Sequence, residues 1–232
     1  MYLYSPDYLI MWYLNYDFEP LPLDVKKTSL DEVVAFFKEI CKRKETANLC
    51  FELMYNISHN AYDQYDKDKF HHLCQILGYL LLQDFSQSFV MLIGSGGNGK
   101  NSLFDGCFTS FAVPTPASNS LEDIERDRFI TGALENKAQN IFLETSAEVH
   151  TDSKVLKNLT GSMYQTIESK GVSKYSGIIN CKYIFSGNDQ DKIKFSDTTQ
   201  GFRRRINLLE IFYAWDPQKR FMKHGDYYDT TF

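Results

Sequence analysis

The chain has 232 residues, of which 43% are hydrophobic and 24% are charged, and its formal net charge is −5. This composition is ordinary for a globular protein and excludes a disordered or collagen-like chain. The negative charge argues against a uniformly basic nucleic-acid coat, but it allows a polyanion to bind one local basic surface.

Three further features favour a cytoplasmic protein. The five cysteines are far apart and include no C-x-x-C pair, which indicates reduced thiols rather than a disulfide framework or a zinc site. The first residues lack the basic start of a signal peptide. The apolar runs fall short of the roughly 20 residues that a membrane span needs. We therefore expect a soluble cytoplasmic protein with no membrane partner.

The first part of the chain predicts helices. A helix-start signal, with Ser29 or Asp31 as the cap, precedes acidic residues and apolar positions at helical spacing, and further helical stretches cover about 46–58 and 69–84. We expect residues 1–85 to form a small helical bundle.

The pattern then changes to short apolar runs that alternate with helical or irregular segments. Such runs are typical of strands that are buried on both faces. Their alternation with helices predicts an α/β fold with a mostly parallel sheet over residues 86–215, followed by a tail over residues 216–232. The runs are residues 89–93, 140–143, 182–186 and 206–211.

A glycine-rich turn follows the first of these runs. Residues 94–100 read GSGGNGK, which fits the P-loop pattern G-x-x-x-x-G-K between a strand and a helix. Phosphate needs closely spaced backbone N–H groups, which glycines supply, and the following helix points its positive end at the same anion. The nucleotide-binding residues predicted from this pattern are Gly94, Ser95, Gly96, Gly97, Asn98, Gly99, Lys100, Asn101 and Ser102.

The metal ligands are less regular. A P-loop normally has Ser or Thr after the lysine, where its hydroxyl holds Mg²⁺, but here Asn101 takes that place and Ser102 follows. Either Asn101 offers its carbonyl oxygen, or a shifted turn brings Ser102 to the metal, or magnesium binding is impaired. The run 140–143 ends in Glu144, a carboxylate suited to hold magnesium and orient the attacking water, and Glu148 is a weaker alternative.

These motifs, in this order, resemble the superfamily 3 helicase region of phage- and plasmid-encoded primase–helicases, the group that includes the poxvirus primase–helicase. The resemblance covers nearly the whole chain. It implies a P-loop NTPase core of the AAA+ type, a helical pre-ATPase or oligomerisation region before it, and ATP with Mg²⁺ as cofactors. The segments that carry it are YSPDYLIMWYLNYDFEP, CQILGYLLLQDFSQSFVMLIGSGGNGKNSLF, RFITGALENKAQNIFLE, VLKNLTGSMYQTIESKG, CKYIFSGN and GFRRRINLLEI.

The resemblance also implies catalytic roles. Lys100 and Glu144 would act on the phosphates and the metal, and Asn188 takes the sensor position, where its amide would contact the γ-phosphate or the attacking water. Arg204 and Arg205 fall on the family's arginine pair, one of which would reach the ATP of a neighbouring subunit. A fork of donors suits the charge on the transferred phosphoryl group. Which arginine acts is open at this point.

The family carries a DNA-gripping hairpin between the acidic strand and the sensor strand. Residues 164–168 and 176–179 would be its arms, with Lys170 and Lys174 at or near the tip. Six copies in a ring would line a channel with positive charge, which reconciles an acidic chain with single-stranded DNA as partner. The implied assembly is a homo-oligomer, a hexameric ring, that works with a primase module or other replication proteins.

This chain departs from the family in two ways. The family commonly has a proline soon after the sensor asparagine, whereas residues 189–191 read DQD. Family proteins also carry a primase or related module before this region and a winged-helix region after it. We therefore expect this chain to be a fragment or the product of a truncated gene.

Three functional readings follow. The first is an ATP-dependent DNA helicase or translocase of phage or plasmid replication that hydrolyses ATP between subunits. The second is a phosphotransferase, a kinase, on the same P-loop, although no arginine-bearing lid is visible in the sequence. The third is a non-catalytic remnant or interaction module, which Asn101 and the missing proline keep open. We favour the first.

Overall fold

A computed structural model of the chain gives the arrangement of its central part. The described residues are 32, 53–62, 64–81, 84–94, 97–108, 116–145, 149–151, 153–187 and 193–212.

A four-stranded parallel sheet with the order β2-β6-β1-β8 forms the centre of the molecule. All residues of β1 and β6 are buried, as expected of central strands that helices cover on both faces. The α/β class, the parallel sheet and the four predicted strands are therefore confirmed. The strands are β1 (Phe89–Ile93), β2 (Gln139–Thr145), β6 (Lys182–Gly187) and β8 (Ile206–Glu210).

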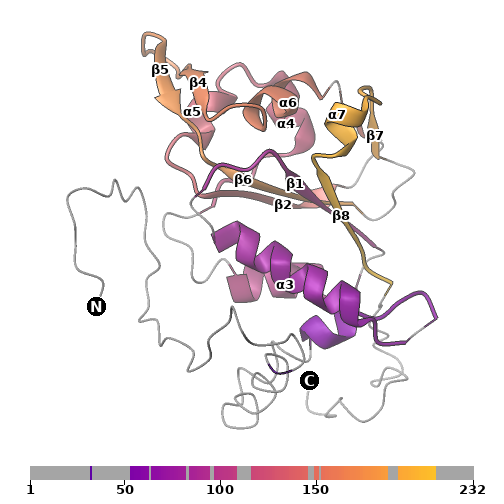
Figure 1. Ribbon diagram of the computed structural model, residues 1–232. Helices are drawn as coiled ribbons and strands as arrows, with labels where there is room; N and C mark the ends of the chain where they lie inside the picture. Colours follow the sequence, from indigo (N-terminus) through magenta and orange to yellow (C-terminus); the bar gives the residue numbers. More distant parts are fainter. Residues whose placement is uncertain are drawn as a thin grey trace, which may run out of the picture.

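Helices lie on both faces of this sheet (Figure 1). On one face, α3 (Lys67–Leu81) and the π-helix η1 (Ser102–Phe108) share a hydrophobic cluster with Val90 and Leu92 of β1. Helical residues 53–57 join the same cluster. The described part of the predicted helical region thus packs directly on the sheet. None of the described helices is both long and apolar enough to cross a membrane.

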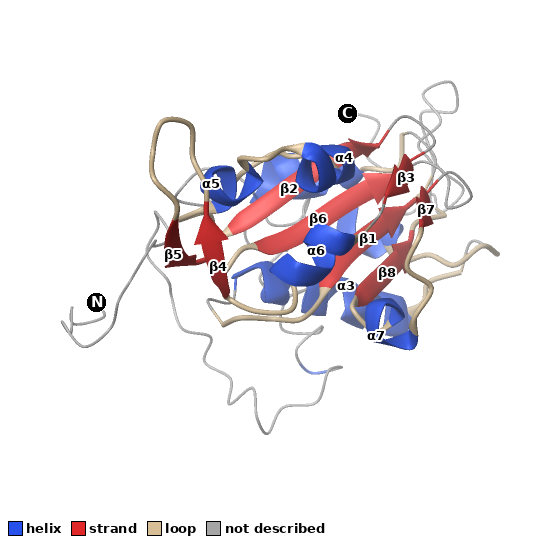
Figure 2. Cartoon of the chain, turned by 90° about the horizontal axis from the view of Figure 1, so that it is seen from above, coloured by secondary structure: helices blue, strands red, loops and turns tan. Residues whose placement is uncertain are grey.

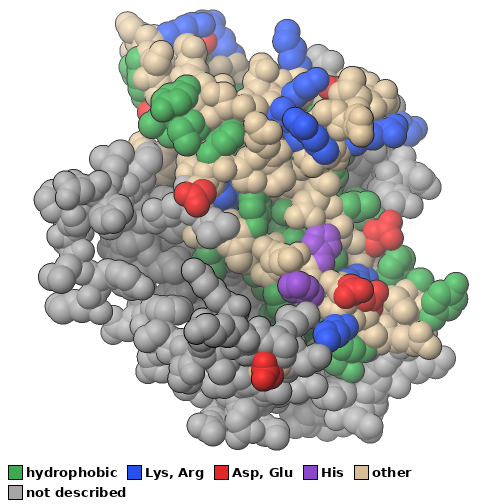
Figure 3. All heavy atoms as spheres, viewed as in Figure 1, with side chains coloured by type: hydrophobic (Ala, Val, Ile, Leu, Met, Phe, Trp, Pro, Cys, Tyr) green, Lys and Arg blue, Asp and Glu red, His purple; other side chains and the backbone are tan. Residues whose placement is uncertain are grey.

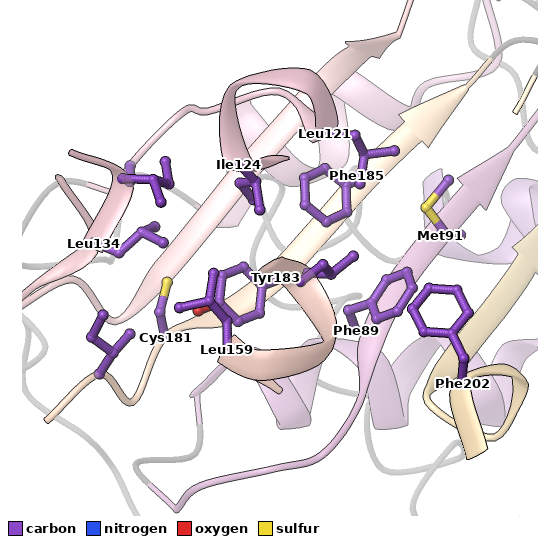
Figure 4. Packing of buried hydrophobic residues seen from close by; sticks show 14 of the residues in the cluster. Phe89, Met91, Leu121, Ile124, Leu134, Leu159, Cys181, Tyr183, Phe185 and Phe202 are labelled. Carbon is purple, nitrogen blue, oxygen red and sulfur yellow. The ribbon is translucent and has the colours of Figure 1, made fainter. Parts of the chain in front are cut away.

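The opposite face carries three short helices over a core rich in aromatic side chains (Figure 4). Phe89 and Met91 of β1 and Phe185 of β6 point into this core, so neighbouring residues of β1 alternate between the two faces. The helices are α4 (Leu121–Arg126), α5 (Ile130–Leu134) and α6 (Lys154–Leu159).

The parallel strands give the sheet two different edges (Figure 2). The strands end together at what we call the carboxyl edge, where a small parallel pair of strands, absent from our predictions, also lies. They begin together at the amino edge, where a hairpin leads into β6 and a short helix leads into β8. These further elements are β3 (Val149–Thr151) with β7 (Ile193–Phe195), the hairpin β4 (Tyr164–Ile167) with β5 (Tyr175–Ile178), and α7 (Gln200–Arg203).

Candidate functional site

The glycine-rich loop begins tightly packed between the neighbouring strands at the carboxyl edge. The Gly94 N–H donates to the carbonyl of Gly187 at 3.1 Å, and the Ile211 N–H donates to the carbonyl of Ile93 at 2.6 Å. A Cβ on Gly94 would lie 2.4 Å from the carbonyl oxygen of Ile211. A side chain is therefore excluded at the first position of the loop.

Two further glycines give the loop its curvature. Gly97 has a φ of 75° and Gly99 a φ of 80°, in the left-handed region that glycine adopts without strain. A Cβ on Gly99 would lie 2.5 Å from Cδ1 of Leu53. The helical residues 53–57 therefore close over the end of the loop, which ties the helical region to the site.

Lys100 is buried inside this loop rather than extended into solvent. Only 4% of the residue is exposed, and its Nζ donates to the carbonyl of Gly94 at 2.6 Å. Burial lowers the pKa of Lys100 to about 8. A bound anion would favour the charged form of Lys100. This buried lysine, whose pKa is lowered, therefore suits an anionic ligand.

Asn98 adds a second buried donor to the loop. Its Oδ1 accepts from the Lys100 N–H at 3.3 Å, whereas its Nδ2 has no hydrogen-bond partner in the described part of the chain. A buried donor without an acceptor is costly. The orphaned Nδ2 and the Lys100 ammonium are donors only, so the chemistry of the loop fits a phosphate chain.

The candidate metal ligands lie at the carboxyl edge of the sheet, with Asn101 and Ser102 directly after the loop and Glu144 on β2. Asn101 and Ser102 are exposed where the helix begins, and Glu144 is exposed near the end of β2, within an irregularity in the pairing of the strand. Burial, together with the charge of Glu144, raises the pKa of Asp105. The carboxylates of Asp105 and Glu144 are thus close enough to interact, and oxygen ligands of this kind suit Mg²⁺.

Asp105 is absent from our predicted site. A signal for it exists in retrospect, because Asp105 follows Asn101, one of the predicted metal ligands, by one helical turn. Four other predicted positions, Ser95, Gly96, Glu148 and Asn188, lie outside the described residues. Gly187, which directly precedes Asn188, contacts the loop through Gly94.

The predicted arginine pair lies at the amino edge, away from the loop. The Phe89 N–H, at the start of β1, donates to the carbonyl of Arg205 at 2.8 Å. The Arg205 guanidinium bonds within the chain, to the carbonyls of Lys157 and Gly201 and to the hydroxyl of Thr160. Arg204 is exposed, and its side chain makes no hydrogen bond or ion pair with the described residues.

The predicted hairpin is present at the same edge. β4 and β5 pair antiparallel, with Tyr164 opposite Ile178. Lys174 lies 2.5 Å from a carboxylate oxygen of Glu168, and Arg128 binds the same carboxylate. Lys170 is exposed and forms no ion pair with the described residues. The two predicted DNA-binding lysines therefore differ, because only Lys174 is already paired.

The hairpin is held in a fixed position against α5. The Glu168 N–H donates to the hydroxyl of Thr131 at 3.0 Å, and the Tyr175 hydroxyl donates to Glu135 at 2.5 Å. A Cβ on Gly132 would lie 2.2 Å from Oγ of Ser169. Figure 3 shows Lys and Arg side chains gathered over the hairpin and over the neighbouring region of α6 and α7. The hairpin, supported in this way by α5, presents a basic surface that suits contact with a polyanion.

A model of a family of unknown function, DUF5906, matches residues 92–205. The curated proteins contain no match to the sequence.

Solved structures of the NrS-1 C-terminal region show the same fold at low sequence identity. An apo structure of the NrS-1 C-terminal region matches with a TM-score of 0.59 and 18% identity over 77% of this chain and 41% of that chain. A second apo form of that region matches with a TM-score of 0.58 over the same shares. A structure of JCV helicase has a TM-score of only 0.38, at 14% identity over 70% of this chain and 45% of that chain. This chain therefore spans about two fifths of the NrS-1 region whose fold it shares.

Proposed function

We propose that this chain is the ATP-hydrolysing part of a DNA helicase or translocase of phage or plasmid replication, built on a superfamily 3 P-loop core. The observation that carries the proposal is the loop after β1. It holds a buried lysine with a lowered pKa, an orphaned amide donor and glycines at the positions where a side chain would clash or be strained.

The hydrolytic part of the proposal rests on the carboxyl edge of the sheet. Lys100 and the Asn98 amide would hold the phosphates, and Glu144 with Asp105 would hold Mg²⁺ and orient the attacking water. Asn101 and Ser102 would supply the remaining metal ligand from the start of the helix. Mg²⁺, when bound, neutralises charge that develops on the transferred phosphoryl group. Asn188, the predicted sensor, directly follows β6 in the sequence.

The two edges of the sheet support hydrolysis between subunits. Arg204 is exposed at the amino edge, and the loop lies at the carboxyl edge, so Arg204 would serve the site of a neighbouring copy. Arg205 would hold that edge in shape through its contacts with α6. A closed ring of identical subunits, a hexamer in our proposal, repeats this contact without free ends.

The DNA contact would be made by the hairpin. Lys170 is free of ion pairs among the described residues and would bind phosphates, with Lys174 as a second contact once Glu168 releases it. The hairpin precedes β6, which ends beside the glycine-rich loop. A movement of β6 on hydrolysis would therefore be passed to the hairpin.

The proposal is tested by ATP hydrolysis with Mg²⁺, measured with and without single-stranded DNA. We expect turnover that rises with DNA and is lost in Lys100→Ala but kept in the control variant Lys154→Ala, which removes an exposed lysine of α6. Turnover that is unchanged by DNA but increased by a small phosphoryl acceptor would support a kinase. If the parent chain binds ATP with Mg²⁺ no better than Lys100→Ala does, a non-catalytic module is the better description.

A further inference from the structure

An open cavity lies beside the glycine-rich loop, between the start of α3 and the end of β8. Its volume is about 480 Å³, within the range of small-molecule sites. Its walls include Asp66, Asp68 and Lys69 on the side of α3, and Glu210 and Phe212 on the side of β8. No residue of this cavity belongs to the site described above.

The cavity adjoins the loop through β8. Glu210 is paired in register with Ile93, the last residue of β1, and neighbouring strands are roughly 4.8 Å apart. Ile211, between Glu210 and Phe212, donates to the Ile93 carbonyl, and its own carbonyl packs on Gly94. If the phosphates of a nucleotide lie in the loop, its nucleoside is therefore long enough to reach the cavity.

Phe212 offers a flat apolar surface at the mouth of the cavity. Its side chain is 50% exposed although the Lys69 ammonium lies 4.5 Å from the centre of the ring. Lys69 is fixed there by a 2.8 Å hydrogen bond to the carbonyl of His59. The remaining exposed part of the ring is suited to stack with an aromatic ligand.

The polar groups of the cavity are mainly acceptors. Asp66 accepts one backbone N–H, from Lys69 at 3.1 Å, which leaves further acceptor positions on this carboxylate. The carboxylates of Asp68 and Glu210 accept no hydrogen bond from the described residues. Carboxylates repel phosphates and accept N–H groups, so the cavity favours an uncharged ligand group that carries an amino substituent.

We propose that this cavity receives the base of the nucleoside triphosphate and selects an amino-bearing base such as adenine. Phe212 stacks on the base, and Glu210 with the acidic residues of α3 accepts from its exocyclic amino group. The inference rests on the proposed function, because the phosphates must lie in the loop for the base to reach the cavity.

Calorimetric binding of three ligands with Mg²⁺ tests this inference: ATP, ITP, in which a carbonyl replaces the amino group, and inorganic tripolyphosphate. We expect ATP to bind about tenfold more tightly than ITP, the size of one hydrogen bond to a charged group. Phe212→Ala should weaken ATP about tenfold and leave tripolyphosphate unchanged. Glu210→Gln should reduce the preference for ATP, whereas the matched control Glu122→Gln, on the exposed side of α4, should keep it.

Two kinds of failure are distinguishable. Equal affinities for ATP and ITP, an unchanged affinity of Phe212→Ala for ATP, or an undiminished preference in Glu210→Gln would each overturn the base cavity. The phosphate site would still stand if tripolyphosphate binds and Lys100→Ala abolishes that binding. If neither ATP nor tripolyphosphate binds the parent chain, the proposed function fails and this inference fails with it.

Discussion

The Arg205 guanidinium donates a 2.8 Å hydrogen bond to the backbone carbonyl of Lys157, which ties the turn before β8 to the last turn of α6. The same nitrogen donates to the hydroxyl of Thr160 at 2.9 Å. Carbonyls in the last turn of a helix lack backbone partners within the helix, and Arg205 donates to one of them. Arg204, its neighbour, is exposed. The two arginines therefore do different work.

Alanine substitutions should separate these two roles. Arg205→Ala removes hydrogen bonds from a charged donor and should lower the free energy of unfolding by about 2 kcal/mol. Arg204→Ala should change it by less than about 0.5 kcal/mol, as for most exposed positions, but should abolish ATP turnover. Chemical denaturation and turnover assays measure both. Mixing Arg204→Ala with Lys100→Ala subunits should restore part of the turnover, and no recovery would argue against a shared site.

A glycine pair tests the shape of the phosphate loop. Gly99→Ala forces an L-residue to a φ of 80° and brings a Cβ to 2.5 Å from Leu53, so it should abolish ATP binding and lower stability. Gly78 lies on the exposed side of α3, and a Cβ added there would meet no atom within 4 Å. Gly78→Ala should therefore raise stability by about 0.5–1 kcal/mol with unchanged ATP binding. Calorimetry and thermal unfolding of both variants decide the matter.

The lowered pKa of Lys100 predicts a proton linkage. Above pH 8 the ammonium loses its proton in the empty site, while bound phosphate favours the charged form. ATP affinity should therefore fall as the pH rises above about 8, and binding near pH 8.5 should take up a proton. Calorimetry in buffers of different ionisation enthalpy measures this uptake, which Lys100→Met should lack. Without ligand, the same shift makes stability rise with pH between about 8 and 10.5.

The ion pairs of Glu168 predict a gain of function. Hydrogen bonds from Lys174 and Arg128 lower the pKa of Glu168, so the carboxylate is charged at neutral pH. Glu168→Gln should free both cations, tighten single-stranded DNA binding a few-fold and steepen its salt dependence. Lys170→Ala should weaken binding, whereas Lys154→Ala should not. Fluorescence anisotropy over a salt series measures each effect, and weaker binding by Glu168→Gln would contradict this account.

The turn before α7 should be sensitive to acid. Asp197 accepts from the Lys157 ammonium at 2.7 Å and from the Thr199 N–H at 2.8 Å, and these bonds lower its pKa to about 2. Its stabilising contribution is therefore present at neutral pH and is lost as the pH falls from about 4 to about 2. Asp197→Asn should melt below the parent chain at pH 7, and the two melting temperatures should converge toward pH 2. A constant difference would assign the effect to the turn alone.

Local patterns predicted the strands because each contains a short, mostly apolar run, and all residues of the central strands β1 and β6 are buried. The residues of β1, 89–93, match their predicted bounds, and the hairpin arms differ from the predicted arms by one residue at the end of β4 and at both ends of β5. The order of the strands was not predictable in this way. β6 lies between β1 and β2, and this pairing depends on contacts between distant segments rather than on either segment's own pattern.

The residues of the candidate site that belong to one contiguous motif were predictable from the sequence. The residues whose roles depend on contacts with distant segments were not. The glycines and Lys100 belong to a contiguous pattern whose chemistry is local. The structural role of Arg205 depends on acceptors at Lys157 and Thr160, which are 48 and 45 residues away. In the cavity beside β8, Lys69 likewise contacts Phe212, and no spacing in the sequence predicts that contact.

β1 separates the lysine of one edge from the arginine of the other. Its five residues, at roughly 3.3 Å each, span about 16 Å, beyond the length of an arginine side chain. If Arg204 completes the site of a neighbouring subunit, the loop and the arginine of one chain belong to two different active sites. A monomer then contains no complete active site. Dilution would then abolish ATP turnover, and turnover per chain would rise with protein concentration until all chains are assembled into rings.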